Sequence, residues 1–214
     1  MNRKQAIVYI HGKGGNAGEA EHYRPLFPDA DVIGLEYEPA APLETAEGFP
    51  ALFAPIFQAY DSVTMVANSI GAWYAMMSLS DAPVERAYFI SPIVNMERLI
   101  LDMMGWAGVT EQELREKGTV ETAFGETLSW NVLCRVRNTP NRWHTPTRVL
   151  YGEKDHLQSY DTVRAFAEQT GAELRVMPGG EHWFHTEEQM DFLDRWITRR
   201  NNGGFPIWLT GNRA

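Results

Sequence analysis

Short apolar runs alternate with longer amphipathic stretches along most of this 214-residue chain. Six of the runs are apolar almost throughout, as expected of strands that helices cover on both faces. They lie at residues 6–10, 32–35, 63–67, 87–90, 148–151 and 174–177. Strands that alternate with helices predict βαβ units, and therefore an α/β fold with a doubly wound, mostly parallel sheet of about six strands.

Helix start signals stand between these runs. Ser159 precedes a stretch with an apolar face that Gly171 is placed to end. Thr110 and Thr186 each lie three residues before a Glu or Gln, which is the spacing of a capping box. We therefore expect helices to begin directly after Thr110, Ser159 and Thr186.

One region interrupts the alternation. Residues 95–145 contain no convincing strand and favour several short helices joined by loops. The segment is rich in large apolar side chains: Met96, Met103, Met104, Trp106, Trp130 and Trp143. An insertion after the fourth strand of such a sheet lies above the carboxyl ends of the strands, where ligands bind. We expect a small helical lid over a substrate pocket; the alternative is that these side chains form the insertion's own core.

The length of the chain predicts one domain over residues 1–200, followed by a tail over residues 201–214. The tail's apolar segment, 205–209, fits a docking site on its own domain or on a second copy in a homodimer, and the sequence does not choose between them. A net charge of −9 without a basic cluster argues against a nucleic-acid partner. The single cysteine and the short first apolar run, 6–10, predict a cytoplasmic protein without a membrane segment.

The first candidate chemistry lies at residues 67–71, Ala-Asn-Ser-Ile-Gly, between an apolar strand and a helical run. A nucleophilic serine on a sharp strand-to-helix turn needs small residues two positions before and after it. Ala67 and Gly71 meet that requirement around Ser69. The alternative is that Ser69 only caps the helix.

The second candidate is the His-Gly-Lys-Gly-Gly turn at residues 11–15, which follows the first strand. Such a turn can aim a backbone N–H at a substrate carbonyl. We expect the amides of Lys13 and Ile70 to form an oxyanion hole. The turn has neither the Walker spacing nor Gly-x-Gly-x-x-Gly, so nucleotide binding is disfavoured.

The acid and the base follow the last two strands. Asp155, on the turn after the fifth strand, is the expected partner of a catalytic imidazole, with Glu153 and Asp161 as competitors. His182 follows a Gly-Gly turn and is preferred as general base over His185, which lies beside a helix cap.

Other chemistries receive less support. The two neighbouring histidines have no further ligands at metal spacing, and no cofactor motif is present, so we expect neither a metal nor a cofactor. His11 is expected to brace its own turn, and Cys134 to be a structural thiol.

Ser69, Asp155 and His182 occur in the order Ser, acid, His, each at the carboxyl end of a strand. With the segments 7–15, 63–72, 148–155 and 177–182, the chain resembles the α/β-hydrolase superfamily, and in particular short bacterial serine hydrolases. It departs from the family pattern in lacking room for two early antiparallel strands and in having Ala67 where many members have glycine. The resemblance implies hydrolysis of a carboxylic ester, thioester or small amide through an acyl-enzyme, with a small acyl compound as substrate. The alternatives are a peptidase-like hydrolase and a non-catalytic ligand-binding or signalling protein of the same fold.

Overall fold

A parallel six-stranded sheet forms the centre of the molecule in the computed structural model, which describes residues 4–39 and 41–199. Its strands follow the order β2-β1-β3-β4-β7-β8, and every neighbouring pair is parallel. Their bounds are β1 Gln5–Ile10, β2 Asp31–Gly34, β3 Ser62–Asn68, β4 Arg86–Ile90, β7 Thr147–Gly152 and β8 Glu173–Met177. The six predicted strands and the α/β fold class are confirmed.

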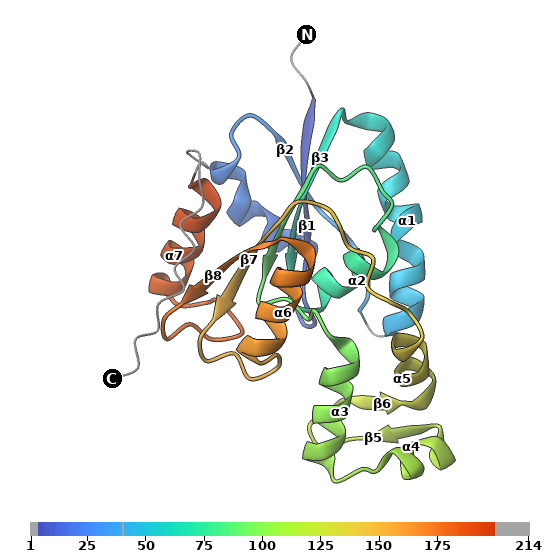
Figure 1. Cartoon of the computed structure of the whole chain (residues 1–214). Coiled ribbons are helices and arrows are strands. Elements are labelled where there is room, and N and C mark those ends of the chain that lie inside the picture. The colour runs from blue at the N-terminus through green and yellow to red at the C-terminus, as the bar shows by residue number, and fades with distance from the viewer. Residues whose placement is uncertain (1–3, 40, 200–214) are drawn as a thin grey trace.

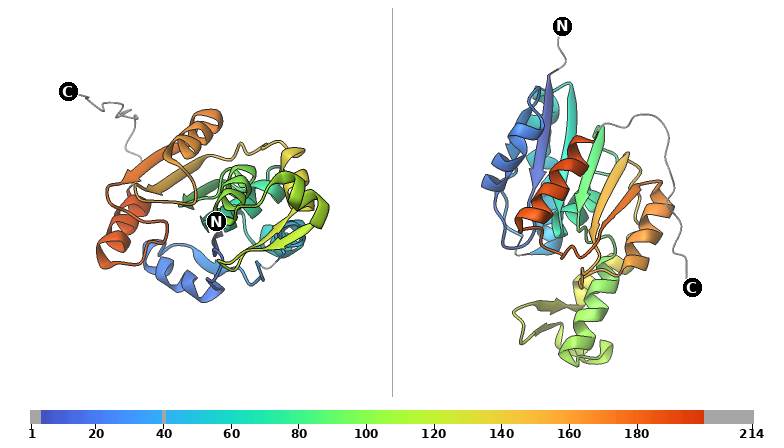
Figure 2. Two further views of the ribbon diagram at one scale, coloured as in Figure 1. Left: turned by 90° about the horizontal axis from the view of Figure 1, so that it is seen from below. Right: turned by 90° about the vertical axis from the view of Figure 1, so that its left-hand side faces the viewer.

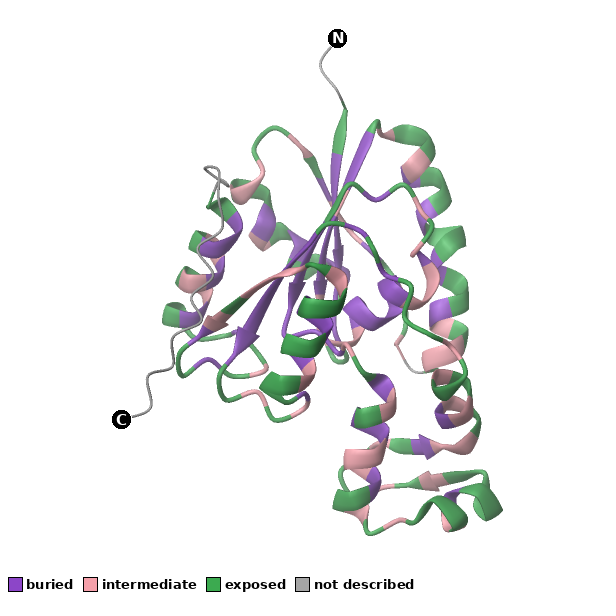
Figure 3. Ribbon diagram, viewed as in Figure 1, coloured by how far each residue is buried: buried purple, intermediate pink, exposed green. Residues whose placement is uncertain are grey.

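Helices cover both faces of the sheet (Figure 1). One face carries α1 (Pro42–Ala59), α2 (Ile70–Ser78) and α6 (Tyr160–Thr170), and the other carries η1 (Ala17–Leu26) and α7 (Glu187–Thr198). Successive strand residues alternate between the two cores, since Val8 packs with the first set and Ile7 with the second. The buried residues therefore lie along the strands and on the helix faces that point toward the sheet (Figure 3).

The predicted caps are in place. Ser159 accepts a hydrogen bond from the Thr162 N–H at 3.2 Å, and Gly171 ends that helix in the left-handed conformation with φ 72°. Thr186 caps α7 in the same way, and Thr110 caps α4 (Glu111–Lys117).

The order of the strands reverses direction between β1 and β3, near the middle of the sheet. The chain runs from β1 to its neighbour β2 on one side, and then continues from β3 to β4 on the other side. Ligands of open α/β sheets bind at such a switch point, outside the carboxyl ends of the strands. Here the loops that follow β1 and β3 lie at that switch point.

The segment between β4 and β7 forms a small subdomain that projects beyond the carboxyl ends of the strands (Figures 1 and 2). It comprises α3 (Met96–Ala107), α4, a hairpin of β5 (Thr119–Glu121) and β6 (Thr127–Ser129), and α5 (Trp130–Arg137). The sequence predicted only helices and loops here, so the hairpin corrects that expectation. Arg137 binds Glu97 at 2.6 Å and Glu111 at 2.6 Å and so ties α5 to α3 and α4.

Several of the insertion's large apolar side chains belong to the core. Met96, Met104 and Trp143 are buried, and Trp143 packs on Phe89 with ring centroids 5.4 Å apart. Trp106, by contrast, is 53% exposed. Core packing therefore accounts for Met96, Met104 and Trp143, but not for Trp106.

The tail expected at 201–214 lies outside the described residues. Among the residues that the structure does describe, no helix has the length and apolar character needed to cross a bilayer.

Candidate active site

Ser69 stands on the sharp turn between β3 and α2. Its backbone adopts φ 52° and ψ −120°, a conformation that side chains rarely occupy. The Ser69 N–H donates to the Ile90 carbonyl at 3.0 Å, and its carbonyl accepts from the Ile93 N–H at 3.1 Å. The turn is thus anchored to the neighbouring strand β4 and to the residues just beyond it.

Close packing explains the small residues around this serine. A Cβ added to Gly71 would lie 2.6 Å from the His11 carbonyl oxygen and 2.8 Å from that of Ile10. Ala67 has no exposed surface at all. A side chain at position 71 would push the turn away from the end of β1, and a larger one at position 67 would overpack the core.

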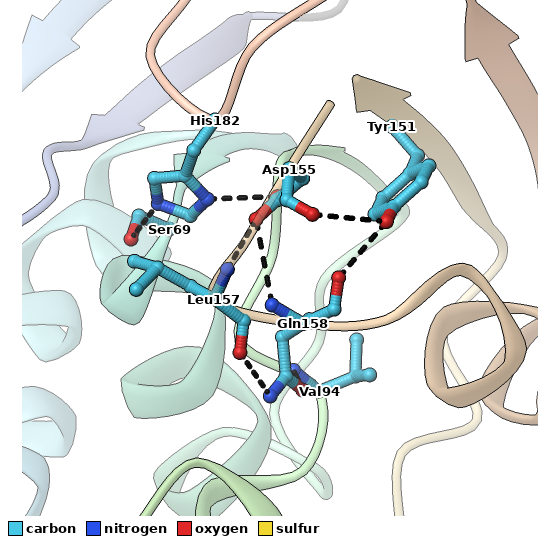
Figure 4. A network of polar contacts seen from close by, with 7 residues as sticks. All are labelled: Ser69, Val94, Tyr151, Asp155, Leu157, Gln158 and His182. Atoms are coloured by element: carbon cyan, nitrogen blue, oxygen red, sulfur yellow. Dashed lines mark hydrogen bonds and ion pairs between the residues drawn. The ribbon is translucent and has the colours of Figure 1, made fainter. Parts of the chain in front are cut away.

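Ser69, His182 and Asp155 form a continuous hydrogen-bonded chain (Figure 4). The Ser69 Oγ lies 2.8 Å from His182 Nε2, and His182 Nδ1 lies 2.7 Å from Asp155 Oδ2. Because a carboxylate only accepts, Nδ1 carries the proton, and Nε2 is free to accept from the Ser69 hydroxyl. The structure therefore brings the three residues together in the arrangement expected of nucleophile, base and orienting acid.

The carboxylate of Asp155 is fully buried, whereas the His182 ring is 14% exposed. Two backbone donors compensate for that burial: the Leu157 N–H binds Asp155 Oδ1 at 2.8 Å and the Gln158 N–H binds it at 3.4 Å. One oxygen is thereby held by the loop, and the other faces the imidazole. This division gives the carboxylate a single orientation toward His182.

The loops after β7 and β8 are joined side by side. The Lys154 N–H donates to the Gly180 carbonyl at 2.7 Å. The second loop passes so close over Gly152 that a Cβ there would lie 2.3 Å from the Glu181 carbonyl oxygen. Glycine at position 152 is therefore needed for Asp155 and His182 to meet.

The competing acids and base have other partners. Glu153 accepts from the Gly179 N–H at 2.7 Å, and Asp161 lies in the first turn of α6, 3.3 Å from Arg164. His185 Nδ1 lies 2.8 Å from the Trp183 carbonyl and stacks on the Trp183 ring. None of these contacts involves Ser69 or His182.

The turn after β1 packs against the serine. A Cβ added to Gly12 would lie 3.1 Å from Ser69 Cβ. The Tyr37 hydroxyl donates to the His11 carbonyl, and the His11 ring stacks on Tyr37 with centroids 4.2 Å apart. His11 Nδ1 and the Gly15 N–H bind the Gly12 carbonyl at 2.8 and 3.2 Å. His11 thus braces its own turn.

Two contacts of the site were not predicted from the sequence. Lys13 Nζ forms an ion pair at 2.6 Å with Glu126, which lies on the hairpin of the insertion. Gln158, only 2% exposed, lies in the loop after β7 that carries Asp155, which we call the acid loop. It links this loop to the start of α3 through hydrogen bonds to Val94 and Asn95. Neither a charged hairpin residue nor a loop glutamine forms a sequence pattern that would have identified it.

Burial also acts on Tyr151, whose hydroxyl donates to the Gln158 carbonyl at 2.9 Å. Desolvation, with the nearby charge of Asp155, raises the pKa of Tyr151 to about 12. The hydroxyl therefore stays protonated, and remains a donor, throughout the neutral range.

A large groove lies elsewhere in the described part of the chain. It has a volume of about 1130 Å³ and lies between α1, α2, α6 and the segment at 138–142. Ser69, Asp155 and His182 do not line it. The groove is therefore separate from the hydrogen-bonded chain of Ser69, His182 and Asp155.

No protein-family model matches the sequence, and no curated protein matches it either. Solved structures, however, match nearly the whole chain. The esterase Est1E from Butyrivibrio proteoclasticus, solved with ferulic acid bound, is 13% identical with a TM-score of 0.72, over 92% of this chain and 87% of that one. Mouse α/β hydrolase domain-containing protein 10 is 15% identical with a TM-score of 0.70, over 90% and 87%.

A proline iminopeptidase-related protein from Thermus thermophilus is 21% identical with a TM-score of 0.58, over 92% of this chain and 89% of that one. These identities are low, so what the three proteins share with this chain is their fold. The chain has the α/β-hydrolase fold.

Proposed function

We propose that this protein is a serine hydrolase that cleaves a carboxylic ester, or a related thioester or small amide, through an acyl-enzyme. The observation that carries the proposal is the chain of contacts from Ser69 Oγ to His182 Nε2 at 2.8 Å and from His182 Nδ1 to Asp155 at 2.7 Å. The esterases among the structural neighbours support the same class of reaction. The substrate is a small acyl compound.

In the first half-reaction, Ser69 Oγ attacks the substrate carbonyl carbon while His182 Nε2 accepts the hydroxyl proton. The imidazolium that forms is stabilised by the Asp155 carboxylate. Collapse of the tetrahedral intermediate breaks the bond to the alcohol, which takes the proton from Nε2 as it leaves. Water then attacks the acyl-enzyme by the same steps, releasing the acid and regenerating the Ser69 hydroxyl.

The negative oxygen of each intermediate is held by the amides of Ile70 and Lys13. Ile70 is the first residue of α2, where unpaired N–H groups and the helix dipole favour negative charge. The carbonyls of His11 and Gly12 are held by Tyr37, His11 and Gly15, which supports a rigid turn at Lys13. Donors that are fixed before the reaction need no reorganisation when charge develops.

The insertion at residues 95–145 is the lid of this site. Its hairpin contacts the turn at residues 11–15, which we call the oxyanion turn, through the ion pair of Glu126 with Lys13. The exposed rings of Trp106 and Phe124 lie edge to face on the same subdomain, with centroids 6.2 Å apart. A lid of this kind would cover the acyl or alcohol group of the substrate and exclude water during acylation.

Labelling with a fluorophosphonate probe tests the proposal. Wild-type protein should become labelled, and Ser69→Ala should not. Ser91→Ala is a matched control, because Ser91 follows β4 with φ 43° and its buried hydroxyl has no partner among the described residues. It should be labelled at the wild-type rate. Equal labelling of wild type and Ser69→Ala would exclude this nucleophile, and absence of labelling from both would favour a ligand-binding protein.

A panel of p-nitrophenyl esters, acyl-CoA thioesters and aminoacyl amides would then identify the scissile bond. Asp155→Asn should lower turnover by about 10⁴-fold, as in other Ser-His-Asp sites. A loss of less than tenfold would contradict the role of Asp155 as the orienting acid.

A further inference from the structure

Gln158 is a buried glutamine at the end of the acid loop, and its side-chain amide is fully occupied by backbone groups. Its Oε1 accepts from the Asn95 N–H at 2.8 Å and from the Val94 N–H at 3.2 Å. Its Nε2 donates to the Asn95 carbonyl at 3.3 Å and to the Leu157 carbonyl at 3.1 Å. The amide therefore pairs with both backbone groups of Asn95, as a neighbouring strand would.

The backbone of the same residue holds the acid. The Gln158 N–H points at Asp155 Oδ1 at 3.4 Å, beside the closer Leu157 N–H, and the Gln158 carbonyl accepts from the Tyr151 hydroxyl (Figure 4). A shift of Gln158 would move both backbone donors to the Asp155 carboxylate. Since that carboxylate is fully buried, the loss of either donor would leave part of its charge uncompensated.

Asn95 is the N-cap of α3, the first helix of the insertion, and its side chain accepts from the Arg98 N–H at 2.9 Å. Gln158 thus joins the root of the insertion to the loop that carries Asp155. We infer that Gln158 is a positioning residue, which sets the orientation of Asp155 toward His182 by fixing the acid loop against the start of the insertion. This inference rests on the proposed function, in which Asp155 orients the base.

A purely structural role would be different: Gln158 would only satisfy the backbone groups that precede α3. The two roles separate in a double-mutant cycle. Gln158→Met keeps the length and apolar stem of the side chain and removes its four hydrogen bonds. If Gln158 acts through Asp155, this change should lower kcat/KM about 10- to 100-fold in the wild-type background, because small misplacements of catalytic groups cost that much. In the Asp155→Asn background it should cost less than twofold.

Tyr151→Phe provides a second, milder variant. It removes the hydroxyl that donates to the Gln158 carbonyl at 2.9 Å and, at a longer 3.5 Å, to the Asp155 carbonyl. It should lower kcat/KM several-fold in the wild-type background and not at all with Asp155→Asn. Ser159→Ala is the matched control. It removes the cap of α6 one residue further on, so it should lower stability without lowering kcat/KM in either background.

A readout without turnover keeps this inference separate from the proposed function. Proton NMR of the downfield Nδ1–H of His182 reports its contact with Asp155 directly. Gln158→Met should shift or broaden that resonance, and Ser159→Ala should leave it in place. Equal fold losses in both backgrounds, or an unchanged resonance with kcat/KM within twofold of wild type, would overturn the inference. Failure of the wild type to react with a fluorophosphonate would instead remove the proposed function.

Discussion

The backbone of Ser69 stores strain that a glycine would release. Its φ of 52° and ψ of −120° correspond to a turn position that glycine dominates, because a Cβ there crowds the backbone. A residue held in such a conformation costs about 1–3 kcal/mol. Ser69→Gly removes the Cβ, whereas Ser69→Ala keeps it and loses the same hydroxyl. The difference in stability between these two variants therefore isolates the strain.

The expected difference follows from two opposing terms. Relief of strain favours Ser69→Gly by about 1–3 kcal/mol, and the greater freedom of glycine in the unfolded chain opposes it by about 0.4–1 kcal/mol. We expect Ser69→Gly to exceed Ser69→Ala by about 1 kcal/mol in free energy of unfolding, or roughly 3 °C in Tm for a domain of this size.

Urea unfolding of both variants, monitored by circular dichroism and by tryptophan fluorescence, measures this difference. The two probes must give the same midpoint, so that the two-state free energies are comparable. Neither variant should react with a fluorophosphonate. If Ser69→Gly were less stable than Ser69→Ala, the turn would not be strained, and the energetic reasoning would be wrong.

Three further expectations follow from the same region. Gly71→Ala should lower the free energy of unfolding by about 1–3 kcal/mol in urea titrations, because its Cβ would lie 2.6 Å from the His11 carbonyl; Gly105→Ala, where a Cβ meets nothing within 4 Å, should not. Tyr37→Phe should lower kcat more than it changes KM in steady-state assays, because the His11 carbonyl loses its donor and the oxyanion turn loosens. The free energy of unfolding should fall as pH rises from about 10 toward 12. Burial raises the pKa of Tyr151, and also those of Tyr9, Tyr23, Tyr37 and Tyr74, so the folded state retains protons that the unfolded state releases. Tyr151→Phe should remove one share of that decline in pH-dependent urea titrations, and an unchanged slope would contradict the assignment.

The sequence predicted the sheet well because its strands are buried on both faces, and short continuous apolar runs such as 63–67 are typical of strands in that setting. The capped helices were predictable because Ser159 and Thr186 act within three residues of themselves. The hairpin was not, since its strands have three residues each and depend on Val120 and Leu128 packing against the insertion. Short strands of this kind carry too little periodicity to be recognised.

In the candidate site, too, some features follow from local sequence patterns and others depend on long-range packing. Ser69, Asp155 and His182 were predictable because each follows a strand, and parallel strands bring their carboxyl ends to one edge. Their exact contacts depend on residues that no local pattern marks. The hydroxyl of Tyr37 reaches His11 from 26 residues away, and the amide of Gln158 reaches Asn95 from 63 residues away. Such long-range partners follow only from the packed structure.

The insertion leaves and re-enters the sheet at neighbouring strands. The chain leaves the sheet after β4 and returns in β7, which is the next strand of the same sheet. Ser69 is anchored to β4 through Ile90, and the Asp155 loop is anchored to the His182 loop through Lys154 and Gly180. The sheet and the contacts between its loops therefore bring Ser69, His182 and Asp155 together. Changes in the insertion can reach the proposed catalytic residues through contacts that cross to it. Among these are the ion pair of Lys13 with Glu126 and the hydrogen bonds of Gln158, whose backbone N–H faces the buried carboxylate of Asp155.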